Sequence, residues 1–158
     1  MFCRDAGTLA SPLHTNNPQS AFPSPHKPLV GYTIQEEFWE DNVAAIKYSS
    51  GQWARSYGSI YHGSTVMRTR QIGGSMSVKF QGSAIKFMGA QGWDHGSFVV
   101  NLDGEETTVD GYCCGPNGGS AQVVQFEATG LSTAEQVLNV INLAAGPSGT
   151  VLEVDALL

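Results

Sequence analysis

The residues whose types are best suited to bind a ligand lie in one short loop, Trp93-Asp94-His95, which follows an apolar segment. Sugars present apolar C–H faces and rings of hydroxyl groups, so proteins hold them with an aromatic ring beside a few fixed polar groups. This loop offers that combination, and tyrosines in other loops would extend the aromatic surface. The ligand-binding residues that we predict are Trp93, Asp94, His95, Tyr57, Tyr61 and Tyr112.

A competing interpretation of the same loop requires no ligand. Trp93 would then close one end of the fold, and His95-Gly96 would set the turn that follows. Exposure of an aromatic patch around Trp93 would favour ligand binding, whereas burial of Trp93 and the nearby tyrosines would favour the structural interpretation.

Catalysis has little support in the sequence. No Gly-x-Ser-x-Gly nucleophile motif accompanies His62 or His95. Asp94 and Asp103 could form the paired carboxylates of a glycosidase, but Asp103 is explained by the turn in which it lies. We therefore expect that the chain is not an enzyme.

These loops require strands to position them, and a period of two in the apolar residues predicts such strands. Asp103-Gly104 between two alternating segments is a strong hairpin signal, because a type I′ turn needs positive φ at both central positions. We expect the segments 75–80, 84–89 and 97–102 to form three consecutive antiparallel strands. Further strands are expected at 33–40, 43–48, 65–71, 107–109, 122–128, 136–142 and 151–157. This spacing predicts an all-β fold, an antiparallel β-sandwich or jelly roll.

Composition and charge argue against several classes of function, among them nucleic-acid binding and spanning a membrane. The chain has 158 residues and a net charge of −6, which gives a nucleic-acid partner no electrostatic support. No apolar run approaches the roughly 20 residues that span a bilayer, and the N-terminus lacks the apolar core of a signal peptide. Of the three cysteines, Cys113 and Cys114 are adjacent; we favour two small loop residues and keep a vicinal disulfide as the alternative.

The N-terminal region differs in composition from the rest of the chain. Five of the seven prolines lie in it, among Ser, Thr, Asn and Gln: Pro12, Pro18, Pro23, Pro25 and Pro28. Such a segment cannot bury enough apolar surface to offset the entropy lost on ordering. We predict a flexible, disordered tail over residues 1–31 and a β-sandwich domain over residues 32–158.

A series of short motifs follows a recognisable order over about residues 36–158. They are Asp41-Asn42, Ile46-Lys47-Tyr48-Ser49-Ser50-Gly51, Tyr61-His62-Gly63-Ser64, Phe80-Gln81-Gly82-Ser83-Ala84-Ile85, His95-Gly96-Ser97-Phe98-Val99-Val100 and Leu152-Glu153-Val154-Asp155. Their order and spacing resemble the galactose-binding-like jelly-roll ectodomain found in fungal single-pass membrane proteins. The fold is also that of carbohydrate-binding modules. The resemblance implies a non-catalytic, lectin-like recognition module at the cell surface or outside the cell, with a glycan or cell-wall polysaccharide as ligand. The alternative that it leaves open is a structural or protein-interaction ectodomain without a sugar ligand.

The resemblance also implies a structural Ca²⁺ ion, because related sugar-binding jelly rolls hold one between the first strand and the last. Calcium takes six to eight oxygen ligands, including carboxylates. Acids lie at both ends of the predicted domain, and the metal ligands that we predict are Glu40, Asp41 and Asp155. The competing interpretation is that these are ordinary solvated acids near the termini.

Overall fold

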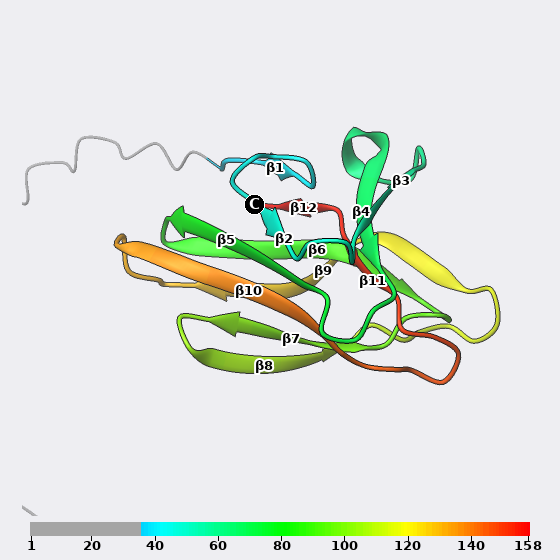
Figure 1. Ribbon diagram of the computed structural model, residues 1–158. Coiled ribbons are helices and arrows are strands. Elements are labelled where there is room, and N and C mark those ends of the chain that lie inside the picture. Colours follow the sequence, from blue (N-terminus) through cyan, green and yellow to red (C-terminus); the bar gives the residue numbers. More distant parts are fainter. Residues whose placement is uncertain (1–35) are drawn as a thin grey trace, which may run out of the picture. The chain divides into compact units, whose positions relative to one another are not determined.

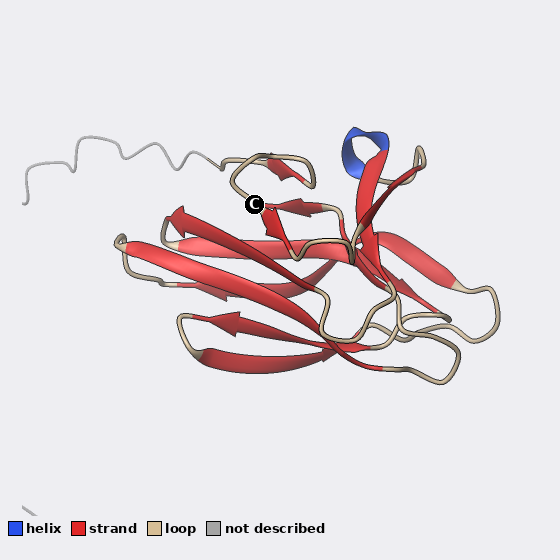
Figure 2. Ribbon diagram, viewed as in Figure 1, coloured by secondary structure: helices blue, strands red, loops and turns tan. Residues whose placement is uncertain are grey.

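The structure is a computed structural model that describes residues 36–158, and these residues form the predicted antiparallel β-sandwich (Figure 1). Figure 2 shows that strands make up nearly all of its regular structure, with a single 3₁₀ turn. The elements are β1 (Trp39–Glu40), β2 (Lys47–Tyr48), β3 (Ala54–Tyr57), η1 (His62–Ser64), β4 (Thr65–Thr69), β5 (Ser75–Gln81), β6 (Ala84–Gly92), β7 (Ser97–Leu102), β8 (Glu105–Asp110), β9 (Gly119–Thr129), β10 (Glu135–Ala144), β11 (Leu152–Val154) and β12 (Ala156–Leu157).

Two main sheets face one another. One has five strands in the order β2-β5-β10-β7-β8, and the other has four in the order β1-β12-β6-β9. A smaller sheet, β11-β4-β3, continues from the four-stranded sheet, because β12 follows directly after β11 (Figure 1). The pairings of β11 with β4 and of β1 with β12 bring the C-terminal strands against elements from the start of the domain.

The core lies between the two main sheets. In β5 the buried residues Met76, Val78 and Phe80 alternate with polar residues, as the period of two predicts. Phe87 of one sheet meets Phe98 of the other, with ring centroids 5.8 Å apart in an edge-to-face arrangement. Each such side chain stabilises the fold by about 1.5–3 kcal/mol relative to leaving it exposed.

The predicted hairpin at Asp103-Gly104 is confirmed. Leu102 of β7 lies opposite Glu105 of β8, so two residues form the loop. Asp103 has a φ of 51° and Gly104 a φ of 95°, the positive values that a type I′ turn requires.

The prediction of three consecutive antiparallel strands is wrong in its pairing. β5 pairs with β2 and β10, whereas β6 pairs with β12 and β9 in the other sheet. The chain crosses between the sheets at Gly82-Ser83, as in a jelly roll. A period of two identifies the buried face of a strand but not the sheet to which the strand belongs, because both sheets bury one face against the same core.

The proposed flexible tail over residues 1–31 lies outside the described residues. Within residues 36–158, no helix has the length and apolar character that crossing a bilayer would need.

Candidate functional site

The loop from Trp93 to Gly96 joins β6 to β7, and backbone hydrogen bonds hold it from two sides. The N–H of Trp93 donates to the carbonyl of Gly118 at 3.0 Å, and the N–H of Val151 donates to the carbonyl of Asp94 at 3.0 Å. Trp93 keeps 36% of its surface exposed. The loop is therefore fixed by its backbone while the indole remains available to a ligand.

Two glycines in the neighbouring loop let the backbone of Asp94 and His95 approach closely. A Cβ atom on Gly149 would overlap the carbonyl oxygen of Asp94, and one on Gly146 would overlap that of His95. Both approaches are closer than real Cβ atoms allow. The turn 145–149 thus sets the position from which the Asp94 side chain projects.

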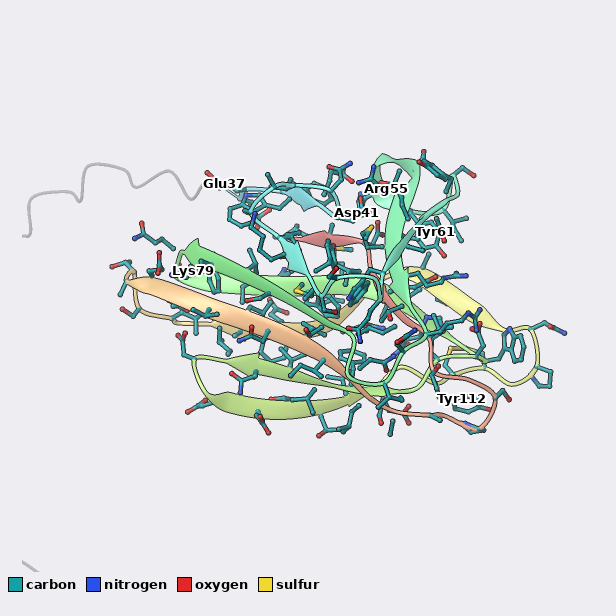
Figure 3. All side chains as sticks on the ribbon, viewed as in Figure 1. Glu37, Asp41, Arg55, Tyr61, Lys79 and Tyr112 are labelled. Carbon is teal, nitrogen blue, oxygen red and sulfur yellow. A yellow bond between two sulfur atoms is a disulfide. The ribbon has the colours of Figure 1, made fainter. Side chains whose placement is uncertain are left out.

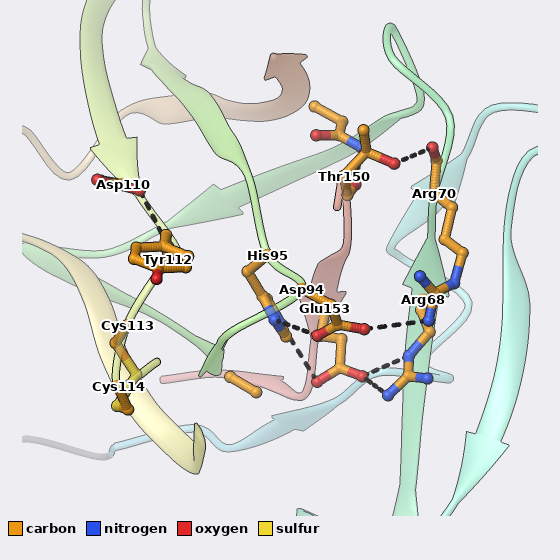
Figure 4. A network of polar contacts seen from close by, with 12 residues as sticks. Arg68, Arg70, Asp94, His95, Asp110, Tyr112, Cys113, Cys114, Thr150 and Glu153 are labelled. Carbon is orange, nitrogen blue, oxygen red and sulfur yellow. Dashed lines mark hydrogen bonds and ion pairs between the residues drawn. A yellow bond between two sulfur atoms is a disulfide. The ribbon is translucent and has the colours of Figure 1, made fainter. Parts of the chain in front are cut away.

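Two basic side chains orient the carboxylate of Asp94 (Figure 4). Arg70 donates from Nη2 to Asp94 Oδ2 at 3.1 Å, and His95 Nδ1 lies 3.2 Å from Asp94 Oδ1. Arg70 is itself held by its backbone, since Thr150 Oγ1 donates to the Arg70 carbonyl at 2.5 Å. The side chain of Arg70 is 58% exposed, so the ion pair of Arg70 and Asp94 borders solvent.

His95 lies behind this ion pair. Its side chain is buried, and its Nε2 is 3.6 Å from Glu153 Oε2, an ion-pair distance longer than a hydrogen bond. The direct ligand contact predicted for His95 does not agree with this burial. Instead, the imidazole lies between the carboxylates of Asp94 and Glu153, and neither of its ring nitrogens has a hydrogen-bond partner among the described residues.

Glu153 anchors the network in the core. It lies directly opposite Arg68 in the pairing of β11 with β4, and Arg68 hydrogen-bonds to its carboxylate. Tyr61 donates from its hydroxyl to Glu153 Oε2 at 3.2 Å. Burial raises the pKa of Glu153, but its contact with His95 and the charge of Arg68 outweigh burial and bring that pKa below its ordinary value. Glu153 is thus a buried carboxylate whose negative charge is stabilised by neighbouring groups of the protein.

The three predicted tyrosines are separated by the fold. Tyr112 forms a bridge with Gly92 and lies at the end of the sandwich where the Trp93 loop begins (Figure 3). Tyr61 lies behind the site, and burial, followed by the charge of Glu153, raises its pKa. Tyr57 is 77% exposed and lies opposite Thr65 in the pairing of β3 with β4. Thr65 precedes Arg70 by five residues, which corresponds to about 17 Å of extended chain at about 3.3 Å per residue. Tyr57 is therefore remote from Arg70, although it lies next to the turn that contains Tyr61.

The predicted site residues did not include Arg68, Arg70 and Glu153. Two features of the sequence pointed to them: Arg68 and Arg70 share one face of a predicted strand, and Glu153 lies between apolar residues in the strand predicted at 151–157. A buried acid needs a partner. However, only the register of β11 against β4 identifies Arg68 as that partner.

A second group of acids lies where the first strand meets the last. The N–H of Asp41 donates to the carbonyl of Asp155 at 3.0 Å. Asp41 Oδ1 accepts from the hydroxyl of Thr65 at 2.7 Å, and Asp155 Oδ1 accepts from the N–H of His62 at 2.9 Å. The remaining oxygens Asp41 Oδ2 and Asp155 Oδ2 are buried without a hydrogen-bond partner, as is Glu40 Oε2. We call Glu40, Asp41 and Asp155 the carboxylate cluster.

The carboxylate cluster has the chemistry of a site for a hard cation. Burial raises the pKa of Asp155 to about 6, and the charges of Glu40 and Asp41 act in the same direction. Within residues 36–158, no three His, Cys, Asp or Glu side chains converge in an already formed metal centre. The three unpartnered oxygens nevertheless match the donors that Ca²⁺ prefers.

Comparisons with known proteins show where this fold recurs. No family model matches the chain. It is 29% identical over 106 residues to an A type blood N-acetyl-α-D-galactosamine deacetylase of Flavonifractor plautii, covering 65% of this chain and 13% of that protein. An exo-β-1,3-galactanase of Phanerochaete chrysosporium is similar in structure, with a TM-score of 0.52, 17% identity and coverage of 77% and 28%. A two-domain esterase active on acetylated mannans has a TM-score of 0.59, 11% identity and coverage of 89% and 40%.

These matches correct one prediction and leave another without confirmation. The prediction that the chain is not an enzyme is wrong, because the matched galactanase, esterase and deacetylase are all enzymes. The chain spans less than half the length of each of them. Membership of the fungal ectodomain family is not confirmed. The likenesses establish a β-sandwich of the kind that recurs in carbohydrate-active proteins.

Proposed function

We propose that this chain is a carbohydrate-recognition domain that binds a glycan through Trp93 and the ion pair of Arg70 and Asp94. The observation that carries the proposal is an exposed indole on the residue that precedes Asp94 in the chain, whose carboxylate pairs with Arg70. We call these three residues the Trp93 surface.

The indole supplies apolar contact area. An aromatic ring has few rotatable bonds, so it buries area against a ligand with little loss of conformational entropy. The backbone of Trp93 is already fixed by its hydrogen bond to Gly118, which further reduces the ordering needed on binding.

The ion pair supplies hydrogen bonds in a fixed geometry. The carboxylate of Asp94 accepts from sugar hydroxyls, and the guanidinium of Arg70 donates to hydroxyl or ring oxygens. Contacts with His95 and Thr150 hold the pair in place before a ligand arrives. Such support from outside the contact surface is what a specific site requires.

The matched proteins support the choice of ligand class and of location. One acts on β-1,3-galactan and one on acetylated mannans, so glycans with several free hydroxyl groups are the first class to test. The disulfide between Cys113 and Cys114 is the type of bond that persists in oxidising compartments. These observations support our proposal that the domain acts outside the cell, as part of a carbohydrate-active protein.

The test compares two exposed aromatic residues. Trp93→Ala should lower affinity for a bound polysaccharide at least tenfold, because stacking and its apolar contact are lost. Tyr57→Ala removes an even more exposed ring far from the Trp93 surface and should leave affinity unchanged. Affinity electrophoresis in gels containing galactan or acetylated mannan measures both variants, with melting temperature as the folding control.

Two results would count against the Trp93 surface. One is undiminished binding by folded Trp93→Ala, and the other is equal loss in both variants. Failure of the wild type to bind any glycan would instead favour the alternative of a structural domain or one that binds a protein partner.

We further propose that the carboxylate cluster binds Ca²⁺ through Glu40, Asp41 and Asp155. The ion would neutralise buried acids at the junction of the first and last strands. Three unpartnered buried oxygens and the raised pKa of Asp155 support this role. A ligand that binds only the folded state at 1,000 times its dissociation constant stabilises it by about 4 kcal/mol.

Thermal unfolding tests the ion directly. Saturating Ca²⁺ should raise the melting temperature of the EDTA-treated wild type by several degrees and leave Asp155→Asn unchanged. Magnesium at the same concentration is the control, because its smaller octahedral shell suits a flexible carboxylate site less well. Identical melting curves with calcium and with EDTA would refute the assignment.

A further inference from the structure

The bond between Cys113 and Cys114 joins neighbouring residues in the loop that also contains Gly118, the hydrogen-bond partner of Trp93. We infer that this vicinal disulfide positions Trp93, so that the Trp93 surface is competent to bind only in the oxidised protein. The inference rests on the proposed glycan-binding function and adds a redox condition to it.

A vicinal disulfide cannot act as a long-range crosslink. Disulfides stabilise proteins mainly by closing long loops in the unfolded chain, and this one closes a ring between residues separated by one position. Its effect is therefore local: it restricts the backbone of the two cysteines and of the loop that contains them.

That loop hydrogen-bonds to both polar groups of the peptide that joins Gly92 to Trp93. On one side the N–H of Cys113 donates to the carbonyl of Gly92 at 3.2 Å. On the other side the N–H of Trp93 donates to the carbonyl of Gly118 at 3.0 Å. A third bond, from the N–H of Gly118 to the carbonyl of Gly115, closes the loop between them. The positions of Cys113 and Gly118 thus determine where Trp93 lies.

The backbone of the loop adopts an unfavourable conformation, which other interactions must stabilise. Cys114 has a φ of 74° and Asn117 a φ of 62°, both in the left-handed region that side chains with a Cβ disfavour. Gly118 packs so tightly on Cys114 that an added Cβ would lie 2.6 Å from the Cys114 carbonyl oxygen and Cβ. The disulfide ring keeps Cys114 in this conformation, and its opening would let the residue return to negative φ and shift Gly118.

The disulfide is accessible to a reductant. Cys114 is exposed and Cys113 is half-buried. A thiolate of a dithiol reductant attacks Cys114 Sγ, which gives a mixed disulfide and releases the Cys113 thiolate, which takes up a proton. The second thiol of the reductant then loses its proton and displaces Cys114 as a thiol. The products are two cysteine thiols and the cyclic disulfide of the reductant, a transfer of two electrons and two protons.

The experiment uses the full chain with Cys3→Ser, so that the pair is the remaining source of thiols. Indole N–H signals of the three tryptophans are recorded by ¹⁵N NMR before and after reduction by dithiothreitol, and Trp93→Phe assigns the Trp93 signal. We expect the Trp93 signal to shift while those of Trp39 and Trp53 stay in place. The double variant C113S/C114S should reproduce the reduced spectrum.

Binding is measured on the same samples with galactan and acetylated mannan. We expect reduction to weaken affinity at least tenfold with little change in melting temperature. An unmoved Trp93 signal, or a shifted signal with unchanged affinity, would overturn the inference. If the oxidised protein binds neither polysaccharide, the proposed glycan function fails in that assay, while the Trp93 signal still decides whether the disulfide positions the indole.

Discussion

Two acidic regions of this domain use the same residue types in opposite ways. Around Glu153 the buried carboxylate faces Arg68, His95 and the hydroxyl of Tyr61, so its charge is matched within the protein. In the carboxylate cluster, Asp155 faces further acids, and oxygens of all three carboxylates have no partner. The structure thus contains one buried carboxylate whose charge is matched within the protein and a cluster whose carboxylates each keep an oxygen without a partner among residues 36–158.

The difference shows how pairing determines what a buried acid does. Burial disfavours the charged form of both Glu153 and Asp155. Arg68 and His95 reverse that effect for Glu153, whereas Glu40 and Asp41 reinforce it for Asp155. The pKa of Glu153 is therefore lowered and that of Asp155 is raised, although both carboxylates are buried.

The largest expected effect on stability comes from removing the buried charge of Glu153. Glu153→Gln removes the charge that pairs with Arg68 while keeping the side-chain volume. We expect the free energy of unfolding to fall by about 2–3 kcal/mol, at the lower end for a broken buried ion pair because Arg68 still reaches water. Urea denaturation followed by tryptophan fluorescence measures the loss.

A matched control separates this effect from removal of any charge. Glu135→Gln breaks the ion pair with Lys79, in which both side chains are mostly exposed. Such pairs contribute little, so no measurable change is expected. Equal stability of Glu153→Gln and the wild type would show that the network around Glu153 is not a structural anchor.

The next largest effect is on the pH dependence of stability, to which Asp155 and Glu153 contribute with opposite sign. The pKa of Asp155 is about 6 in the folded state against an ordinary 3.8, so the folded protein holds a proton that the unfolded chain releases between these values. Without calcium, the contribution of Asp155 is greatest below about pH 4 and is lost as the pH rises through 6. Glu153, with its lowered pKa, contributes stability above its ordinary 4.5 that is lost as the pH falls.

Denaturation of the wild type and of Asp155→Asn between pH 4 and pH 7 in EDTA measures the contribution of Asp155. The asparagine keeps an oxygen for the N–H of His62. We expect the wild type to lose about 1–2 kcal/mol relative to the variant as the pH rises, at about 1.4 kcal/mol per pKa unit less solvent screening. Parallel profiles would remove the electrostatic basis for the calcium proposal.

The smallest effect on stability is expected for the ion pair of Arg70 and Asp94, which borders solvent. Arg70→Gln breaks an ion pair in which Arg70 is mostly exposed, so the free energy of unfolding should change by less than ~0.5 kcal/mol. Glycan affinity should nevertheless fall about tenfold, the loss of one charged hydrogen bond. Isothermal titration calorimetry distinguishes this result from a purely structural ion pair, for which affinity would not change.

The sequence was sufficient to predict features that depend on local patterns. Alternating residues identified the longer strands but missed β3, and Asp103-Gly104 identified the hairpin because positive φ is a local requirement. The meeting of Asp41 with Asp155 is not a local feature; it was expected from the resemblance, in which the first and last strands lie together.

Features that depend on pairing between distant strands could not be obtained in this way. The network through Glu153 requires the register in which Glu153 lies opposite Arg68, and neither residue determines that register alone. The burial of His95 depends on packing between its loop and Gly146, which no short-range pattern reveals. The disulfide of Cys113 and Cys114 was only an alternative, since adjacent cysteines form one only in a suitable backbone.

A glycan array probed with the oxidised full chain, in calcium and in EDTA, tests the central claim most directly. We predict selective binding to glycans from the galactan or mannan classes that is lost in Trp93→Ala and kept in Tyr57→Ala. A blank array with a folded sample, or binding that survives removal of the Trp93 indole, would contradict the assignment of the Trp93 surface as a glycan site.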